Sequence, residues 1–71
     1  MMNYLFTVET GEEAGYEFFV QAESEEAAER SAQEEFEGEY LCYGGAFTDF
    51  QAELMGLDTF WAPPPKKNEK N

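Results

Sequence analysis

Carboxylates supply most of the chemistry available to this sequence. The 71 residues include sixteen Asp and Glu, four Lys and Arg, one Cys and no His. Carboxylates can transfer protons, bind cations or present negative charge to a partner, but a chain without His lacks the commonest general base and zinc ligand. No carboxylate pair stands out from the general acidity, and no glycine-rich phosphate loop is present. We therefore expect a protein that is not an enzyme and that needs no metal or cofactor.

Cys42 is the only thiol, so it cannot form a disulfide within the chain. Its neighbours Leu41 and Tyr43 are apolar, which favours an inert buried thiol over a nucleophile. The first residues contain neither a basic segment nor a long apolar run, so we expect no secretory signal and no membrane span. A reducing cytoplasm is then the simplest compartment.

Negative charge is the most unusual property of the chain. Residues 1–62 contain fifteen carboxylates and a single cation, Arg30, which gives a formal charge of −14, and the whole chain carries −12. A net charge of about 2–8 already keeps a small domain soluble, and any excess destabilises it through self-repulsion. The sign excludes direct binding to nucleic acid or to an anionic membrane. It favours a partner with a basic surface.

Two segments with alternating hydrophobicity predict the first strands. Residues 4–9 place Tyr4, Phe6 and Val8 on one face, and residues 16–22 repeat the pattern. Alternation with period two, rich in aromatic residues, is typical of half-buried strands. The polar loop between the segments contains two glycines, so the segments are predicted to form an antiparallel hairpin.

Ser24 and the residues after it predict a helix. Ser24 is a preferred N-cap, and the glutamates that follow suit the positive end of a helix dipole. Ala28, Ala32 and Phe36 recur at a spacing of four and form a narrow apolar stripe. Gly38 lies just past the stripe and predicts the C-terminal end of the helix.

The remaining segments are less regular. Residues 39–43 predict a third strand, which the two glycines at 44 and 45 either end or interrupt with a bulge. Residues 46–57 fit two patterns: a helix capped by Thr48 or Asp49, or a fourth strand. Their aromatic content favours the strand. Phe60 and Trp61 are expected to fold back on the core.

These elements define an α+β fold: an antiparallel sheet of three to four strands with one helix packed on one face, in the order β-β-α-β(-β). Residues 1–62 form one compact acidic domain, and residues 63–71, with three prolines followed by polar residues, form a disordered tail. Both faces of the hairpin carry large apolar side chains. Either the C-terminal segment covers the second face, or some aromatic side chains are exposed.

The outward side of the helix presents a row of acids. Residues four apart rise by about 6 Å along a helix, close to the spacing of successive phosphates in a nucleic-acid strand. The alternative is an ordinary solvated face on which Arg30 bridges Glu26 and Glu34. The residues predicted to bind a partner are Glu25, Glu26, Glu29, Glu34, Glu37, Glu12, Glu13 and Asp49.

The hairpin followed by the capped segment Val20-Gln21-Ala22-Glu23-Ser24-Glu25-Glu26-Ala27 resembles the start of many small phage and mobile-element proteins, including some DpnD/PcfM-like and some anti-CRISPR proteins. The resemblance covers about residues 3–37 and transfers no functional residue. It implies a stoichiometric inhibitor of nucleic-acid-mimic type, whose partner is a basic nucleic-acid-binding protein such as a CRISPR effector. The alternative is an accessory interaction module, either a monomer or a homodimer formed through exposed aromatic residues.

Overall fold

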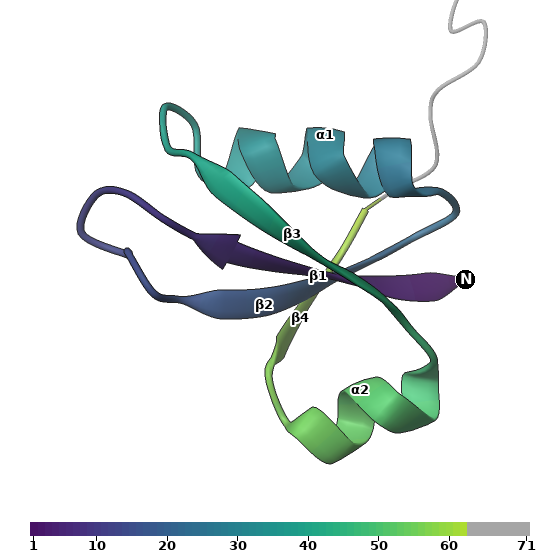
Figure 1. Ribbon diagram of the computed structural model, residues 1–71. Coiled ribbons are helices and arrows are strands. Elements are labelled where there is room, and N and C mark those ends of the chain that lie inside the picture. Colours follow the sequence, from purple (N-terminus) through teal and green to yellow (C-terminus); the bar gives the residue numbers. More distant parts are fainter. Residues whose placement is uncertain (63–71) are drawn as a thin grey trace, which may run out of the picture.

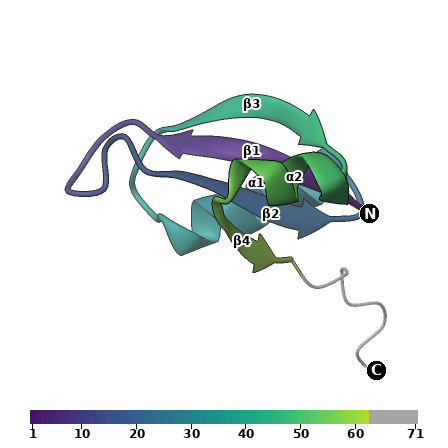
Figure 2. The same ribbon diagram turned by 90° about the horizontal axis from the view of Figure 1, so that it is seen from below.

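The two segments with alternating hydrophobicity form an antiparallel hairpin at the centre of a four-stranded sheet (Figure 1). The computed structural model describes residues 1–62, and the tail predicted to be disordered, residues 63–71, lies outside the described residues. The elements are β1 (Met2–Val8), β2 (Glu17–Ala22), α1 (Glu25–Glu35), β3 (Leu41–Phe47), α2 (Asp49–Met55) and β4 (Asp58–Trp61). Figure 2 shows α2 in front of the sheet and α1 behind it.

The sheet has the strand order β3-β1-β2-β4 and is mixed. β1 pairs antiparallel with both β2 and β3, whereas β2 pairs in parallel with β4. The helix α1 carries the chain from β2 past β1 to β3 on one face, and α2 carries it back to β4 on the other face. Because the two crossovers run in opposite directions on opposite faces, they have the same hand, as the strong handedness preference of such connections requires.

The predicted α+β class is confirmed, but two details of the prediction are wrong. The sheet is mixed rather than antiparallel, and two helices rather than one pack on it. Both differences have one cause. The segment after β3 forms a helix that crosses the second face, so the last strand emerges beside β2 and runs parallel to it.

The main core lies between α1 and the near face of the sheet. Tyr4 pairs with Val20 and Phe6 with Phe18 across the hairpin, so these four side chains point to the same face. They are buried together with Ala28 and Ala32 of α1, as the alternation and the alanine stripe predicted. The small alanines allow the helix to approach the aromatic side chains closely. Burial of each large side chain contributes about 1.5–3 kcal/mol.

The ends of α1 lie at or near the residues predicted for them. The Ser24 side chain accepts a hydrogen bond of 3.1 Å from the Ala27 backbone N–H, which satisfies one of the unpaired donors of the first turn. At the other end, the Phe36 N–H donates to the Ala32 carbonyl, and Gly38 follows with a φ of 87°. The C-cap is therefore Phe36, and the positive φ of Gly38, which favours glycine, belongs to the turn that follows the helix.

The ambiguous segment at residues 46–57 is mainly helical, so the favoured strand was wrong and the helical alternative correct. Thr48 and Gln51 form a reciprocal capping box: the Gln51 N–H donates to Thr48 Oγ1 at 3.2 Å, and the Thr48 N–H donates to Gln51 Oε1 at 2.9 Å. Gly56 ends α2 in the left-handed region. These local signals outweigh the aromatic content, because they satisfy backbone groups at both ends of a short helix.

β3 extends through the two glycines instead of ending at them. The register with β1 shifts between Leu5 and Phe6, so Gly44 is the extra residue of a β-bulge. A Cβ at Gly44 would lie 2.8 Å from Leu5 Cδ2. The glycine therefore lets the strand continue past the Leu5 side chain, which selects the bulge from the two predicted possibilities.

Candidate functional site

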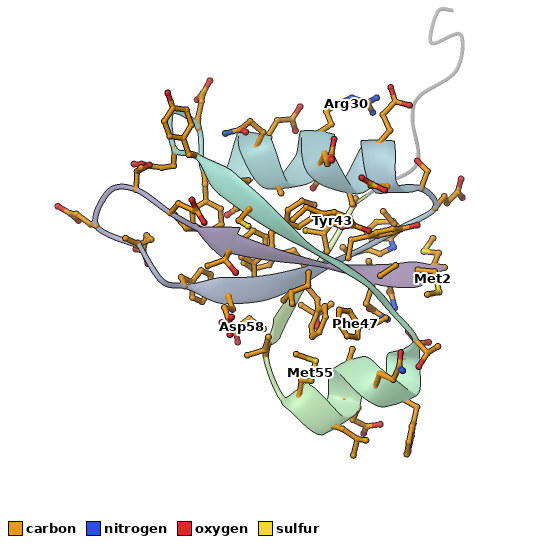
Figure 3. The ribbon with its side chains drawn as sticks, viewed as in Figure 1. Met2, Arg30, Tyr43, Phe47, Met55 and Asp58 are labelled. Carbon is orange, nitrogen blue, oxygen red and sulfur yellow. The ribbon has the colours of Figure 1, made fainter. Side chains whose placement is uncertain are left out.

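Four glutamates of α1 and Glu37, just past its C-terminal end, form the acidic face of α1, which we define as Glu25, Glu26, Glu29, Glu34 and Glu37. All five are exposed. Figure 3 shows Arg30 on the outer side of the same helix, pointing away from the sheet. The buried alanine stripe lies on the opposite side of the helix from Glu26 and Glu34, whereas Glu29 lies at the margin of the acidic face, beside the sheet.

Arg30 neutralises little of this charge. Its Nη2 lies 4.0 Å from Glu26 Oε2, and both side chains are more than half exposed. Within residues 1–62 this is the only ion pair, so the predicted second bridge, to Glu34, is not formed. Exposed pairs of this kind contribute about 0–1 kcal/mol. The acidic face is therefore a surface of mostly uncompensated charge.

Glu12 and Glu13 lie in the β1–β2 loop, at the same end of the molecule as the α1–β3 connection (Figures 1 and 2). Thr10 joins the two segments: its Oγ1 donates to Glu39 Oε1 and accepts from the Tyr40 N–H at 3.0 Å. Gly11, beside the Glu39 carboxylate, has a φ of 82°, a backbone conformation that favours glycine where the segments meet. The loop acids are thus held near the end of α1 that leads to Glu37.

Asp49 does not belong to this surface. It lies at the start of α2, on the opposite face of the sheet. Its Oδ1 accepts hydrogen bonds from Asn3 Nδ2 at 2.7 Å and from Gln21 Nε2 at 3.2 Å. Because the Asn3 side chain is buried, Asp49 satisfies a donor that would otherwise be costly to bury. The structure gives this carboxylate a role in joining α2 to the sheet.

A shallow pocket of about 440 Å³ opens between α2 and the β2–β4 half of the sheet. Its polar groups are amides, carboxylates and one hydroxyl. No three Cys, Asp or Glu side chains within residues 1–62 converge as metal ligands. The residues that line the pocket are Asn3, Gln21, Asp49, Ala52, Glu53, Gly56, Leu57 and Thr59.

Phe60 and Trp61 of β4 were both expected to fold back on the core, but adjacent residues of a strand point to opposite faces, so only one of them does. Phe60 packs against the main core, 5.4 Å from Phe18 between ring centroids. Trp61 points to the other face and is 58% exposed. Cys42 was also expected to be buried but is exposed, because it lies on an edge strand facing away from α1.

The second face of the hairpin is covered by α2, as the first of the two alternatives left by the sequence predicted, although some aromatic side chains are also exposed. Phe19 is fully buried there and contacts Phe47 edge to face, with ring centroids 5.6 Å apart. The exposed apolar side chains lie elsewhere. Phe50 and Leu54, one turn apart on α2, are 70% and 72% exposed, and no pattern in the sequence distinguished them from core residues.

Tyr43 lies where the acidic face meets the sheet. Figure 3 shows it on the α1 side of β3. Burial is the main cause that raises the pKa of Tyr43, followed by the charges of Glu25 and Glu29 and the neighbouring Tyr4. Glu29 of α1 and Tyr43 of β3 line the same small groove, so the acidic face adjoins the edge strand.

No family model, curated protein or solved structure matches this chain. The resemblance of residues 3–37 to mobile-element proteins therefore stays a prediction. Neither helix of residues 1–62 is long and apolar enough to cross a membrane.

Proposed function

We propose that this protein is a non-enzymatic inhibitor that binds a basic nucleic-acid-handling protein through the acidic face of α1. Its carboxylates would occupy the groove in which the partner holds phosphates, in the manner of a DNA mimic of the anti-CRISPR type. A phage origin and action in the cytoplasm of the host bacterial cell are part of this proposal.

One observation carries the proposal. The acidic face presents five exposed glutamates with one weak ion pair, Arg30 to Glu26, although the fold needs none of them for its core. Repulsion between these side chains lowers the stability of the free protein. A binding partner that neutralises them would relieve this repulsion, which would contribute favourably to the free energy of binding. Attraction between opposite charges would also accelerate association and make it sensitive to salt.

A second candidate function rests on α2. Phe50 and Leu54 form an exposed apolar stripe on the opposite face, which favours an interaction module that could form a homodimer. The two functions use different faces. Sedimentation equilibrium separates them, since substitution of Phe50 would dissociate such a dimer without affecting binding through α1.

The test is binding to purified nucleic-acid-binding proteins, including a CRISPR effector, measured by biolayer interferometry at several concentrations of sodium chloride. Binding that weakens with salt and is displaced by duplex DNA would support mimicry. Hen egg lysozyme is the control, because it is basic but has no nucleic-acid groove. Equal binding to lysozyme, or binding that duplex DNA does not displace, would contradict the proposal.

A further inference from the structure

β3 is an edge strand, and no strand of residues 1–62 pairs with its outer side. Natural edge strands are commonly protected by charged side chains or proline. β3 reads Leu-Cys-Tyr-Gly-Gly-Ala-Phe and contains neither, in a chain where more than a quarter of the residues are charged. Its only protective feature is the bulge at Gly44.

The pairing with β1 shows which backbone groups face outward. The Glu9 N–H donates to the Tyr40 carbonyl, whereas the N–H and carbonyl of Val8 are both bonded to the β2 side. In an antiparallel ladder, hydrogen-bonded and non-bonded pairs alternate. Leu41, opposite Val8, and Tyr43, opposite Phe6, therefore direct their N–H and carbonyl groups to the free edge.

A groove lies beside these free backbone groups on the α1 side. It has a volume of about 140 Å³ and is lined by Phe6, Leu41 and Tyr43 of the sheet together with Glu29 and Gln33 of α1. Its floor is aromatic and aliphatic, and Glu29 is its one charged group. Such a site fits the long aliphatic stem and cationic end of a Lys or Arg side chain.

We propose that the outer edge of β3 binds an extended basic segment of a partner protein as a fifth strand, with a Lys or Arg side chain in the groove beside Glu29. The partner's backbone would pair with Leu41 and Tyr43, as in other cases of strand addition. This inference goes beyond the proposed function, because it requires neither a nucleic-acid groove nor the outermost acids of α1.

The negative charge of this chain favours a basic segment, and not a second copy of this chain, as the strand that pairs with the free edge of β3. In an antiparallel pair of two β3 strands, the twofold axis is perpendicular to the sheet, so both α1 helices lie on the same side. Glu29, which lines the groove with Tyr43, would then approach its counterpart, and two chains of formal charge −12 would meet. A basic segment gains from the same charges.

The probe is a fluorescein-labelled seven-residue peptide of alternating lysine and valine, capped at both ends. Two further peptides have the same charge but carry N-methyl groups either on the lysines or on the valines. N-methylation removes backbone donors from one edge of an extended strand only. We expect one methylated peptide to lose binding by tenfold or more and the other to bind like the parent. Equal affinities for the two would overturn the proposal.

Amide hydrogen exchange locates the contact without any substitution in the protein. The parent peptide should slow exchange at Leu41 and Tyr43, whose N–H groups face the free edge, and leave Cys42 unchanged because it already pairs with Thr7. Absence of protection at Leu41 and Tyr43 would overturn the proposal. Protection of the same amides without peptide, rising with protein concentration, would identify a second copy as the occupant and also overturn it.

A charge variant tests the groove. Glu29→Gln should weaken binding of the parent peptide about two- to fivefold, the range of an exposed ion pair. Glu53→Gln removes the same charge from the opposite face and should change binding by less. Equal effects of the two variants would show that peptide binding depends on the net charge of the protein and not on Glu29, which would overturn the place of the groove in the proposal. None of these measurements uses a nucleic-acid-binding protein, so the proposed function can fail while this inference holds, and the reverse.

Discussion

Tyr16 donates a hydrogen bond of 2.6 Å from its hydroxyl to Asp58 Oδ2, although 42 residues separate them in the chain. Tyr16 immediately precedes β2, and Asp58 is the first residue of β4. The contact therefore ties the start of the last strand to the start of the strand beside it. It stabilises a parallel pairing that no local turn could impose.

This contact predicts a titration. The hydrogen bond to Asp58, followed by burial and the Asp58 charge, raises the pKa of Tyr16 to about 12 from 10.0. The neutral hydroxyl donates, whereas a phenolate could not donate and would be repelled. Stability from this contact is therefore fully present below pH 10 and is lost as the pH rises through 12. NMR titration of the tyrosine rings measures the pKa directly.

Asp58→Asn is the decisive variant for that titration. It keeps an acceptor oxygen but removes the charge, so the pKa of Tyr16 should fall toward 10. Glu53→Gln, which removes a charge from the opposite face, should leave the titration unchanged. A pKa of Tyr16 that stays at about 12 in the Asp58 variant would show that the contact is not its cause.

Screening of charge should stabilise the isolated protein. Residues 1–62 carry a formal charge of −14, and the Debye length falls from ~30 Å at 0.01 M salt to ~10 Å at 0.1 M. We expect the melting temperature to rise across this range in sodium chloride. Thermal melts followed by circular dichroism test the prediction. A constant or falling midpoint would mean that the acids are already compensated in the fold.

Phe19 and Phe50 both lie on the α2 side of the sheet but differ in burial, so their replacement should have different effects on stability. Phe19 is fully buried beneath α2, so Phe19→Ala should cost about 3–5 kcal/mol of unfolding free energy. Phe50 is 70% exposed on the outside of α2, and Phe50→Ala should change stability by less than about 0.5 kcal/mol. Urea denaturation measures both. Similar losses for the two variants would contradict the packing of α2 on the second face.

Replacement of three acids on α1 tests the proposed function. Glu26, Glu34 and Glu37 changed together to Gln should weaken target binding at least tenfold and reduce its salt dependence. The fold should be unchanged or slightly more stable, because repulsion is relieved and glutamine is a comparable helix former. Binding is measured by biolayer interferometry and stability by thermal melts.

The control for that variant is Glu9, Glu12 and Glu13 changed together to Gln in the loop region. If this control abolishes binding while the helix variant does not, the binding surface lies on the loop. No effect of either variant would contradict electrostatic mimicry and favour the apolar stripe of α2.

Local patterns in the sequence determined the hairpin and α1. The alternation around Phe6 and Phe18, the cap at Ser24 and the stripe through Ala28 each depend on residues close together in the chain, so they could be interpreted without the rest of the fold. The acidic face of α1 followed from the same periodicity, because burial of the alanine stripe leaves the glutamates outside.

The conformation of residues 46–57 and the place of β4 were decided only by the tertiary structure. A helix cap at Thr48 or Asp49 was visible in the sequence, but aromatic content competed with it. β4 is four residues long, too short for its alternation to separate Phe60 from Trp61. The place of β4 beside β2 and the role of Asp49 against Asn3 both depend on contacts more than 35 residues apart. Local propensity cannot predict such pairings, because their free energy arises only when α2 crosses the sheet and brings the segments together.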